Sequence, residues 1–491
     1  MERGRLNLDA LRENTSVFRI VFIIDMLLTQ LGYISVPAIV AAVFIFFWGW
    51  SLLIKNYVKS NRIKKVNYYG WLILFFVSNI ITILKEGYDD GIWQSVLIVF
   101  FMPVLFFMFY GLHTEAESVE GKKKVEKEIY NLCNIMLWLS IVINIMSLIT
   151  LYTIGKSISY YFGYLVVYEN RFTGLYVNPN LMAFSSFCAV VCCHILWQGD
   201  FAQRVTGKCL TKRRRALILF SAGLNVAVIF LTDSNATVLI MTCYTITYIC
   251  YRMFGGKDFH IGVIMRKIAV VLMVFVAITA VFFAARGLLQ TGATQTMTAP
   301  HDSANVFEDS DDELNKITFE HQNKNLDSGR IKLFKQGVNV IKHHPFFGVG
   351  KGNITKYGNR YNNNKMKYSD FHNGYLTVIV CSGFIGFFFF LGFAVCLGWR
   401  MARTIFGVKP EIKSDIFPCL VSFIAAYCVY SFFERALVYD TTFMIVIFWA
   451  VLGYAAVYMA HYEGAEYKLY AFSSMSIFHK RETQKISSNE Y

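Results

Sequence analysis

Apolar stretches long enough to cross a lipid bilayer recur along most of this chain of 491 residues. A membrane-spanning helix needs about 20 consecutive apolar residues, and by that measure the chain has about 12 candidate spans. They lie at residues 17–32, 37–54, 69–84, 92–111, 129–153, 180–198, 216–232, 237–253, 268–285, 373–398, 415–433 and 443–460. Because only helices and closed barrels satisfy their backbone polar groups inside lipid, the pattern predicts an all-α integral membrane protein. Asp25 and Pro37 interrupt the first two stretches, which form either one broken helix and a hairpin partner or one span and a re-entrant piece.

Composition excludes the other broad classes of protein. Hydrophobic residues make up 55 % of the chain and charged residues 16 %, and the mean hydropathy is +0.44. A soluble protein of this length carries more charge, and a disordered chain carries fewer aromatic residues than the 17 % found here. The net charge of +14 comes from Lys and Arg in short segments between apolar stretches, so we expect no nucleic-acid partner.

The distribution of the basic residues predicts the orientation in the membrane. Alternate loops are basic, and basic loops face the cytoplasm. These loops contain Lys55, Lys59, Arg62, Lys64 and Lys65, then Lys122–Lys124 and Lys127, then Arg204, Lys208 and Lys212–Arg215, then Lys257, Arg266 and Lys267, then Arg400, Arg403, Lys409 and Lys413. We therefore expect both termini in the cytoplasm. No small-residue cleavage site follows Arg3, Arg5 and Arg12, so a retained first helix is predicted rather than a signal peptide.

One loop on the opposite, extracytoplasmic side is far longer than the others. It spans residues 286–372 and separates an N-terminal transmembrane region, 1–285, from a C-terminal one, 373–462, which a cytoplasmic tail, 463–491, follows. Loops of such length are usually functional or disordered. The acidic run at 309–314 predicts that the first part of the loop is a mobile segment.

The second part of the long loop predicts an amphipathic helix. Its apolar stripe would consist of Ile331, Phe334, Val338 and Ile341, with Lys332, Lys335 and Lys342 away from the stripe. Such a helix can lie on the membrane surface. Asp327 or Ser328 would cap its start, and Pro345 follows its end.

Two places in the long loop are candidates for chemistry. Arg330 stands in the opening turn of the predicted helix, where a phosphate group would meet free N–H groups and the guanidinium together. Alternatively, Arg330 pairs with Asp327 or faces solvent. His372 and Asn373 stand at the start of the next span, at the water boundary. A histidine there can act as a base, or it can simply hydrogen-bond the helix end.

Glycines surround a third candidate in the long loop. In the segment HHPFFGVGKGN, residues 343–353, Gly348, Gly350 and Gly352 flank Lys351 and allow the backbone to approach a ligand closely. Lys351 is therefore a candidate substrate-binding residue. Alternating glycines also form ordinary turns.

A shorter loop on the same predicted side adds more polar residues. Arg171 precedes a turn in which Asn178 and Asn180 bracket Pro179, and the two asparagines either bind a ligand or cap the next helix. The pair Ser234 and Asn235, between two later spans, also faces this side.

Three further candidate sites can also be explained by structural roles alone. Asp25 lies in an apolar stretch, where a charge is by default functional, unless the residue is interfacial. The acidic run at 309–314 could imitate a metal-binding carboxylate pair, but a solvated segment is the simpler interpretation. Glu434, Arg435 and Asp440 form either a salt-bridged lid or an edge that contacts sugar.

The order of the motifs carries more information than any one of them. RFTGLYVNPNLMA comes first, then LTDSNATVL, then SGRIKLFKQGVNVIKHHPFFGVGKGN in the long loop, and finally FHNGYLTVIVCSGFIG. This order resembles the O-antigen ligase and Wzy polymerase superfamily of bacterial membrane glycosyltransferases. The resemblance covers roughly residues 165–460 and is most specific over 328–386.

The resemblance implies a membrane enzyme without metal or other cofactor that transfers a glycan from an undecaprenyl diphosphate carrier to an acceptor hydroxyl. The reaction would take place on the outer face of the bacterial cytoplasmic membrane. Carried over to this chain, the family's loop arginine falls on Arg330, its histidine on His372, and its arginine before the Asn-Pro-Asn turn on Arg171. The arginines would hold the diphosphate, and His372 would position or deprotonate the hydroxyl. Asn180, Lys351 and Asn373 would contact the substrate.

The chain also departs from the family pattern. Asn235 stands where members often have an arginine, Phe334 where a tryptophan is common, and Cys381 where an acidic residue is frequent.

Several functions remain open at this level. A bias towards Lys, Asn, Ile, Phe and Tyr, together with the lack of Cys in outside loops, favours a bacterium without a lipid A core. That favours a polymerase, whose acceptor is another carrier-linked repeat unit, over a ligase. Its partners would include membrane lipid, a flippase and a chain-length regulator. The alternative of another class is a lipid-linked oligosaccharide flippase, which would show two comparable halves with short loops. A non-catalytic assembly partner is a third reading.

Overall fold

The computed structural model describes residues 13–86, 91–154, 167–168, 171–254, 330–363, 370–407, 415–463 and 472, and scattered helical residues between 269 and 291. Every predicted span except the ninth coincides with a helix in these ranges. The ninth falls on the scattered residues. The acidic run at 309–314, the capping residues Asp327 and Ser328 and nearly all of the predicted tail lie outside the described residues.

The N-terminal part of the chain consists of helices and one short hairpin. The elements are α2 Thr15–Leu28, α3 Ser35–Leu53, α4 Tyr69–Glu86, α5 Ile92–Pro103, α6 Val119–Ile154, strands β1 Val167–Tyr168 and β2 Arg171–Phe172, α7 Pro179–Trp197, α8 Gly199–Thr206, α9 Lys212–Leu231 and α10 Asn235–Phe254. Helices α3 and α5 continue without a break into the turns Ile54–Val58 and Val104–Glu115, respectively. The first two apolar stretches are therefore two separate helices, α2 and α3.

The C-terminal part contains the remaining elements. They are α12 Arg330–His343, a 3-10 turn Lys351–Asn353, α13 Ile354–Tyr361, α14 Gly374–Gly407, α15 Phe417–Tyr430 and α16 Phe443–Glu463. In the described part of the chain, 8 helices are long and apolar enough to cross a bilayer, and α15 is a shorter apolar helix. The predicted class, an all-α integral membrane protein, is confirmed. The total of about 12 spans stays a prediction.

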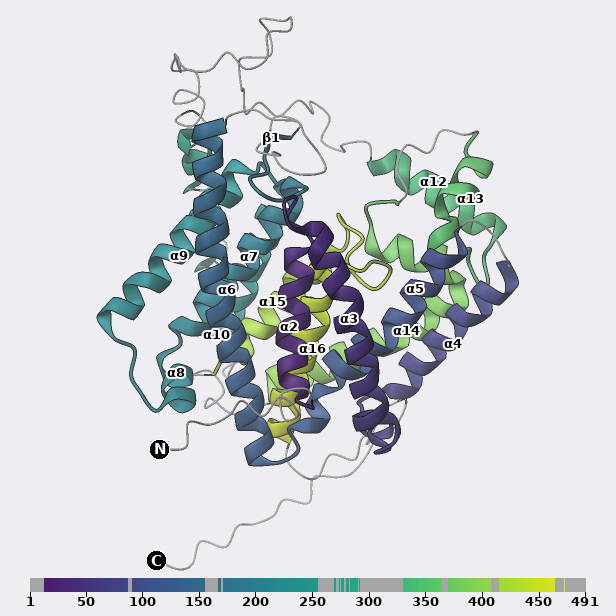
Figure 1. Cartoon of the computed structure of the whole chain (residues 1–491), viewed down its shortest axis with the longest axis horizontal. Helices are drawn as coiled ribbons and strands as arrows, with labels where there is room; N and C mark the ends of the chain where they lie inside the picture. The colour runs from purple at the N-terminus through teal and green to yellow at the C-terminus, as the bar shows by residue number, and fades with distance from the viewer. Residues whose placement is uncertain are drawn as a thin grey trace, which may run out of the picture.

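Helix α16 forms the centre of the bundle. Nearly all of it is buried, with Trp449 fully enclosed, and it packs against α2, α15 and the turns Val104–Glu115 (Figure 1). A helix that is apolar on all sides is expected in such a central position. By contrast, α3 exposes Phe44 and Phe47 on its outer face, as a helix in contact with lipid does.

Loops predicted to lie on the same side of the membrane meet at the same end of the bundle. At one end, Lys65 pairs with Glu117 at 3.0 Å, and Arg204 pairs with Asp415 at 2.8 Å. At the other end lie β1, α12 and α13, which Figure 1 places opposite α8. The alternation of basic and non-basic loops therefore agrees with how the helices run.

Helix α14 is broken at Gly383, and the chain before α13 inserts at the break. Gly383 has φ of +65°. Val349 and Gly350 donate their N–H groups to the carbonyls of Val380 and Cys381 at 3.0 and 2.9 Å. After the break, the Phe384 N–H donates to the Pro345 carbonyl at 2.7 Å. The backbone groups that the break releases are thus satisfied by another segment, which a helix at membrane depth requires.

Helix α12 is amphipathic, but the buried face is not the predicted one. The side chains buried against its neighbours are Leu333, Gln336 and Val340, and Gly337 lies tightly against Leu376 of α14. Ile331 and Phe334 of the predicted stripe are more than half exposed. The prediction failed because Gly337 carries no side chain to mark that face, yet it permits the closest approach of the two helices. The exposed pair remains available for contact with lipid.

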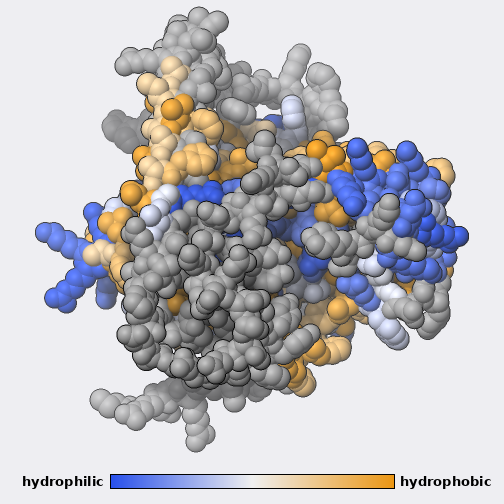
Figure 2. All heavy atoms as spheres, turned by 90° about the horizontal axis from the view of Figure 1, so that it is seen from above, coloured by the Kyte–Doolittle hydropathy of each residue, from blue (hydrophilic) through white to orange (hydrophobic). Residues whose placement is uncertain are grey.

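At the end of the bundle that carries α12 and α13, the surface has distinct hydrophilic and hydrophobic regions. Figure 2 shows hydrophilic side chains gathered over these two helices, beside apolar surface of the bundle. Lys332, Lys335, Lys342, Lys356 and Arg360 are all exposed there.

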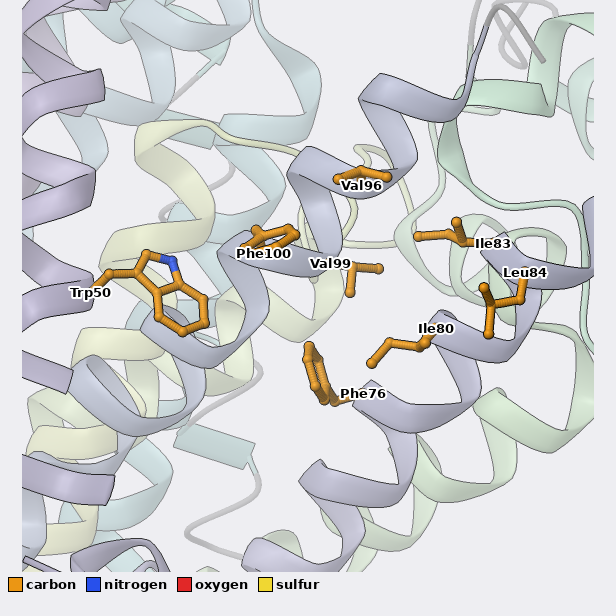
Figure 3. A pocket seen from close by; sticks show the side chains of 8 residues that line it. All are labelled: Trp50, Phe76, Ile80, Ile83, Leu84, Val96, Val99 and Phe100. Carbon is orange, nitrogen blue, oxygen red and sulfur yellow. The ribbon is translucent and has the colours of Figure 1, made fainter. Parts of the chain in front are cut away.

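A cavity of about 270 Å³ opens between α3, α4 and α5. Figure 3 shows its lining, which runs from Trp50 through Phe76 and Ile80 to Val96 and Phe100. None of the lining residues is charged, and Phe100 is half exposed. The cavity suits a hydrocarbon chain and offers no group for catalysis.

The break in α14 yields a stability prediction. Gly383→Ala should destabilise the protein by at least about 1–2 kcal/mol, since a Cβ is strained at positive φ. It would also stand 2.2 Å from the Phe346 carbonyl oxygen. Gly398→Ala, in the same helix with nothing within 4 Å of the new Cβ, is the control. Thermal unfolding of the purified protein in detergent measures both, and equal midpoints would contradict the role given to Gly383.

Candidate functional site

Three segments that are distant in sequence converge at the end of the bundle that carries α12. They are the loop 370–373 before α14, the connection 431–442 between α15 and α16, and the segment 171–180 that leads into α7. The Gly374 N–H donates to the Ser431 carbonyl at 2.7 Å, which ties the first two segments together.

His372 lies between two carboxylates. Its Nδ1 is 3.6 Å from Oε2 of Glu434, and its Nε2 is 3.6 Å from Oδ1 of Asp370. The backbone at His372 has φ of +46°, a sparsely populated conformation for a side chain of this size. The Asp370 carboxylate supports it by accepting the His372 N–H at 2.9 Å. Strain of this kind persists where the surroundings fix it, and it clusters at functional sites.

The two carboxylates change the protonation of His372. A hydrogen bond with Glu434 and the charge of Asp370 raise the pKa of His372, against burial and the charge of Arg330, which lower it. Burial raises the pKa of Asp370, but the charges of Arg435 and His372 outweigh it and leave that pKa below its usual value. Asp370 is therefore ionised, and the charged form of His372 is favoured.

Arg435 bridges two acids beside this pair. It donates from Nη1 to Oδ2 of Asp370 at 2.6 Å, and its Nε is 2.7 Å from Oδ2 of Asp440. Of the two interpretations of Glu434, Arg435 and Asp440, the geometry therefore favours the salt-bridged one. Arg435 fixes Asp370, which in turn holds His372.

Arg171 reaches the same place through an asparagine. It donates to the Thr232 carbonyl at 2.9 Å and to Oδ1 of Asn180 at 2.7 Å. Nδ2 of Asn180 donates to Oε1 of Glu434 at 3.0 Å. Asn178 acts as the helix cap, because its side chain accepts from the Asn180 N–H. The two asparagines thus have different roles.

Arg330 approaches from α12. Its guanidinium lies over the ring of Phe433, 5.2 Å from the ring centre, next to Glu434 in the chain. Arg171 is connected to Glu434 through Asn180. Two arginines from separate elements therefore lie near Glu434, the neighbour of His372.

Lys351 and Asn373 occupy the edge of the cluster. Lys351 is 4 % exposed, its Nζ has no hydrogen-bond partner in the described part of the chain, and its charge acts on Asp370. Asn373 accepts the Leu376 N–H at 2.9 Å and so caps α14. Asp25 lies apart from this cluster, buried in α2.

The sequence did not single out three residues that the fold brings here or nearby. Asp370 stands two residues before His372, a spacing that could have drawn attention to it. Tyr430 is the last residue of the apolar helix α15, so the sequence pattern does not distinguish it from the other buried residues of that helix. Arg286 pairs with Asp233 and donates to Oδ1 of Asn235 at 3.1 Å, so a cation reaches the position where family members often carry an arginine.

Among the residues with described positions, no group of three His, Cys, Asp or Glu side chains is placed to hold a metal ion.

The ion pairs of Arg435 yield a second prediction. Arg435→Leu should lower the free energy of unfolding by about 3 kcal/mol, since it leaves the carboxylates of Asp370 and Asp440 without their shared cation. Lys335→Leu, at an exposed position on α12, is the control. Chemical denaturation in detergent would compare them. A loss no larger than that of the control would show that the bridge is not structural.

Comparison with known protein families agrees with this geometry. Residues 217–391 match a family model described as O-antigen ligase. This range includes Arg286, Arg330, Lys351, Asp370 and His372, whereas Arg171 and Glu434 lie outside it. No curated protein matches the chain. The match over residues 217–391 confirms the resemblance of this chain to the O-antigen ligase and Wzy polymerase superfamily.

Proposed function

We propose that the protein is a polysaccharide repeat-unit polymerase. It transfers a glycan from an undecaprenyl diphosphate carrier to a hydroxyl of another lipid-linked repeat unit, on the outer face of the bacterial cytoplasmic membrane. The observation that carries the proposal is that Arg171, bonded to Asn180, and Arg330, over the ring of Phe433, both lie near the pair formed by His372 and Glu434.

The arginines would bind the leaving group. A diphosphate carries several negative charges, and guanidinium groups bind phosphate oxygens with paired hydrogen bonds. Arg330 lies in the first turn of α12, where the backbone N–H groups of a helix have no partner within the helix and would add to the binding. Stabilising the charge that develops on the diphosphate accelerates departure. The proposal therefore assigns no step to a metal ion.

His372 would position or deprotonate the attacking hydroxyl. Attack on the anomeric carbon from the side opposite the diphosphate is a single displacement, so the product should have the inverted anomeric configuration. Asn180 would fix the positions of Glu434 and Arg171 relative to each other, since its side-chain amide forms hydrogen bonds with both. Lys351 and Asn373 would contact the glycan at the edge of the site.

Two alternatives remain as competing functions. A ligase would use the same donor site with a different acceptor. A flippase would place its cationic residues along a path near the middle of the membrane. The candidate residues gather instead at one end of the bundle, which supports a transferase. A flippase and a chain-length regulator would then be partners of the polymerase, and not its own activities.

The site residues yield a test in cells. Arg330→Ala and His372→Ala should each reduce long polymer at least about 100-fold, the scale expected for loss of a group that stabilises developing charge. Lipid-linked single repeats should accumulate while the protein level is unchanged. Gels of lipid-linked and surface glycan show this, and Lys335→Ala on the exposed face of α12 is the control.

The same gels separate the competing functions. In cells without the protein, single repeats on the outer face support a polymerase. Intact polymer that stays on its carrier would identify a ligase, and glycan trapped on the cytoplasmic face would identify a flippase. If both variants still make full-length polymer, the site assignment is wrong.

The orientation yields a test by labelling. Cys209 is exposed in the loop 207–211, which we place in the cytoplasm. A membrane-impermeant maleimide added to intact cells should miss Cys209 and should label a cysteine introduced by Lys342→Cys, on the exposed face of α12. The reverse pattern would invert the orientation.

A further inference from the structure

We propose that Glu434, rather than His372, accepts the proton of the attacking hydroxyl, and that His372 acts as a cation that positions the Glu434 carboxylate. The inference rests on the proposed transferase function and assigns the base within that site.

The surroundings of His372 argue against its acting as the base. Each ring nitrogen faces a carboxylate at 3.6 Å, Nδ1 facing Glu434 and Nε2 facing Asp370. An imidazole placed between two anions is stabilised as imidazolium, in which both nitrogens are donors. Such a ring has no lone pair with which to take a proton from the hydroxyl.

Charged groups from three elements of the described part of the chain act on His372. Asp370 precedes it in the same loop, Glu434 faces it from the connection between α15 and α16, and Arg330 acts on it from α12. The effect of the two carboxylates exceeds that of burial and of Arg330, and the pKa of the ring is raised.

Asp370 is a poor alternative, because both of its oxygens are already in use. Oδ1 accepts the His372 N–H at 2.9 Å, and Oδ2 accepts from Arg435 at 2.6 Å. A carboxylate held in an arginine ion pair is also a weaker base.

Glu434 has the free capacity that Asp370 lacks. Its Oε1 accepts from Asn180 at 3.0 Å, whereas its Oε2 has only the His372 ring at 3.6 Å among the described residues. Arg171 reaches Glu434 through the neutral amide of Asn180 and not as an ion pair. The carboxylate therefore lies beside the cations that would hold the leaving group and still keeps a lone pair for a proton.

The step balances without another reactant. The acceptor O–H bond breaks and its proton passes to Oε2 of Glu434, while the acceptor oxygen forms a bond to the anomeric carbon. The bond from that carbon to the phosphate oxygen breaks, and its electron pair leaves with the diphosphate. His372 keeps its proton throughout.

The direction in which the reaction rate changes with pH distinguishes Glu434 from His372 as the base. If imidazolium is required, the rate falls as pH rises through the raised pKa of His372, because the cation is lost. If neutral His372 is the base, the rate rises over the same range. The measurement uses the purified full chain in liposomes with lipid-linked repeat units extracted from cells that lack this protein. We expect the falling rate, and we expect His372→Gln to abolish that decline in whatever activity remains.

Variants of the carboxylate provide a second, independent measurement. Glu434→Gln should lower the rate at least about 100-fold, within the range for general-base catalysis, and Glu434→Asp should recover part of it. The matched control is Glu86→Gln. Glu86 at the end of α4 also faces a histidine, His344, at 3.7 Å, but lies outside the site, so its rate should stay close to that of the wild type.

Two outcomes would overturn the inference. One is a wild-type rate that rises through the titration of His372, and the other is a Glu434→Gln variant within about tenfold of the wild type, below the usual effect of a general base. If Arg330→Ala and His372→Ala abolish polymer while Glu434→Gln does not, the transferase function stands and only this inference fails. If the first two variants keep full activity, the function itself is wrong.

Discussion

The interruption of α14 at Gly383 determines how the rest of the candidate site is assembled. A helix cannot leave backbone groups unpaired at membrane depth, so the break requires the segment 345–350 to pair with it. That pairing fixes Lys351 and connects α12, which carries Arg330, to the helix whose first turn follows His372. A second backbone bond, from Gly374 to Ser431, brings the Glu434 connection to the same helix.

The side chains held in this way form a cluster of charges in which the cations outnumber the carboxylates. Asp370 and Asp440 are used by Arg435, and Glu434 is used by His372 and Asn180. Arg171 is connected to Glu434 through Asn180, and Arg330 lies over the ring of Phe433. A doubly charged leaving group is what such an excess of cation would attract. In the proposed reaction, the carboxylates would hold the site together and take up the proton, and the two arginines would bind the substrate.

Much of the fold could be predicted from the sequence, because membrane spans depend on length and apolarity alone. The meeting of Arg171, Arg330 and His372 was predictable only through the family resemblance. The sequence points to Glu434 only as part of a salt-bridged lid or of an edge that contacts sugar. It does not point to Asp370, since nothing local shows which side of His372 an acid will occupy. The buried face of α12 was predicted wrongly, because Gly337 allows α12 to approach α14 closely but has no apolar side chain that would mark this face in the sequence. Contacts between distant segments decide these features, and periodicity does not report them.

The most direct test of the central claim is a structure of the full protein with a lipid-linked repeat unit bound. We predict the diphosphate between the guanidinium groups of Arg171 and Arg330, with His372 and Glu434 on the side from which an acceptor would approach. A diphosphate bound at the opposite end of the bundle, near Arg204 and Lys65, would contradict the account.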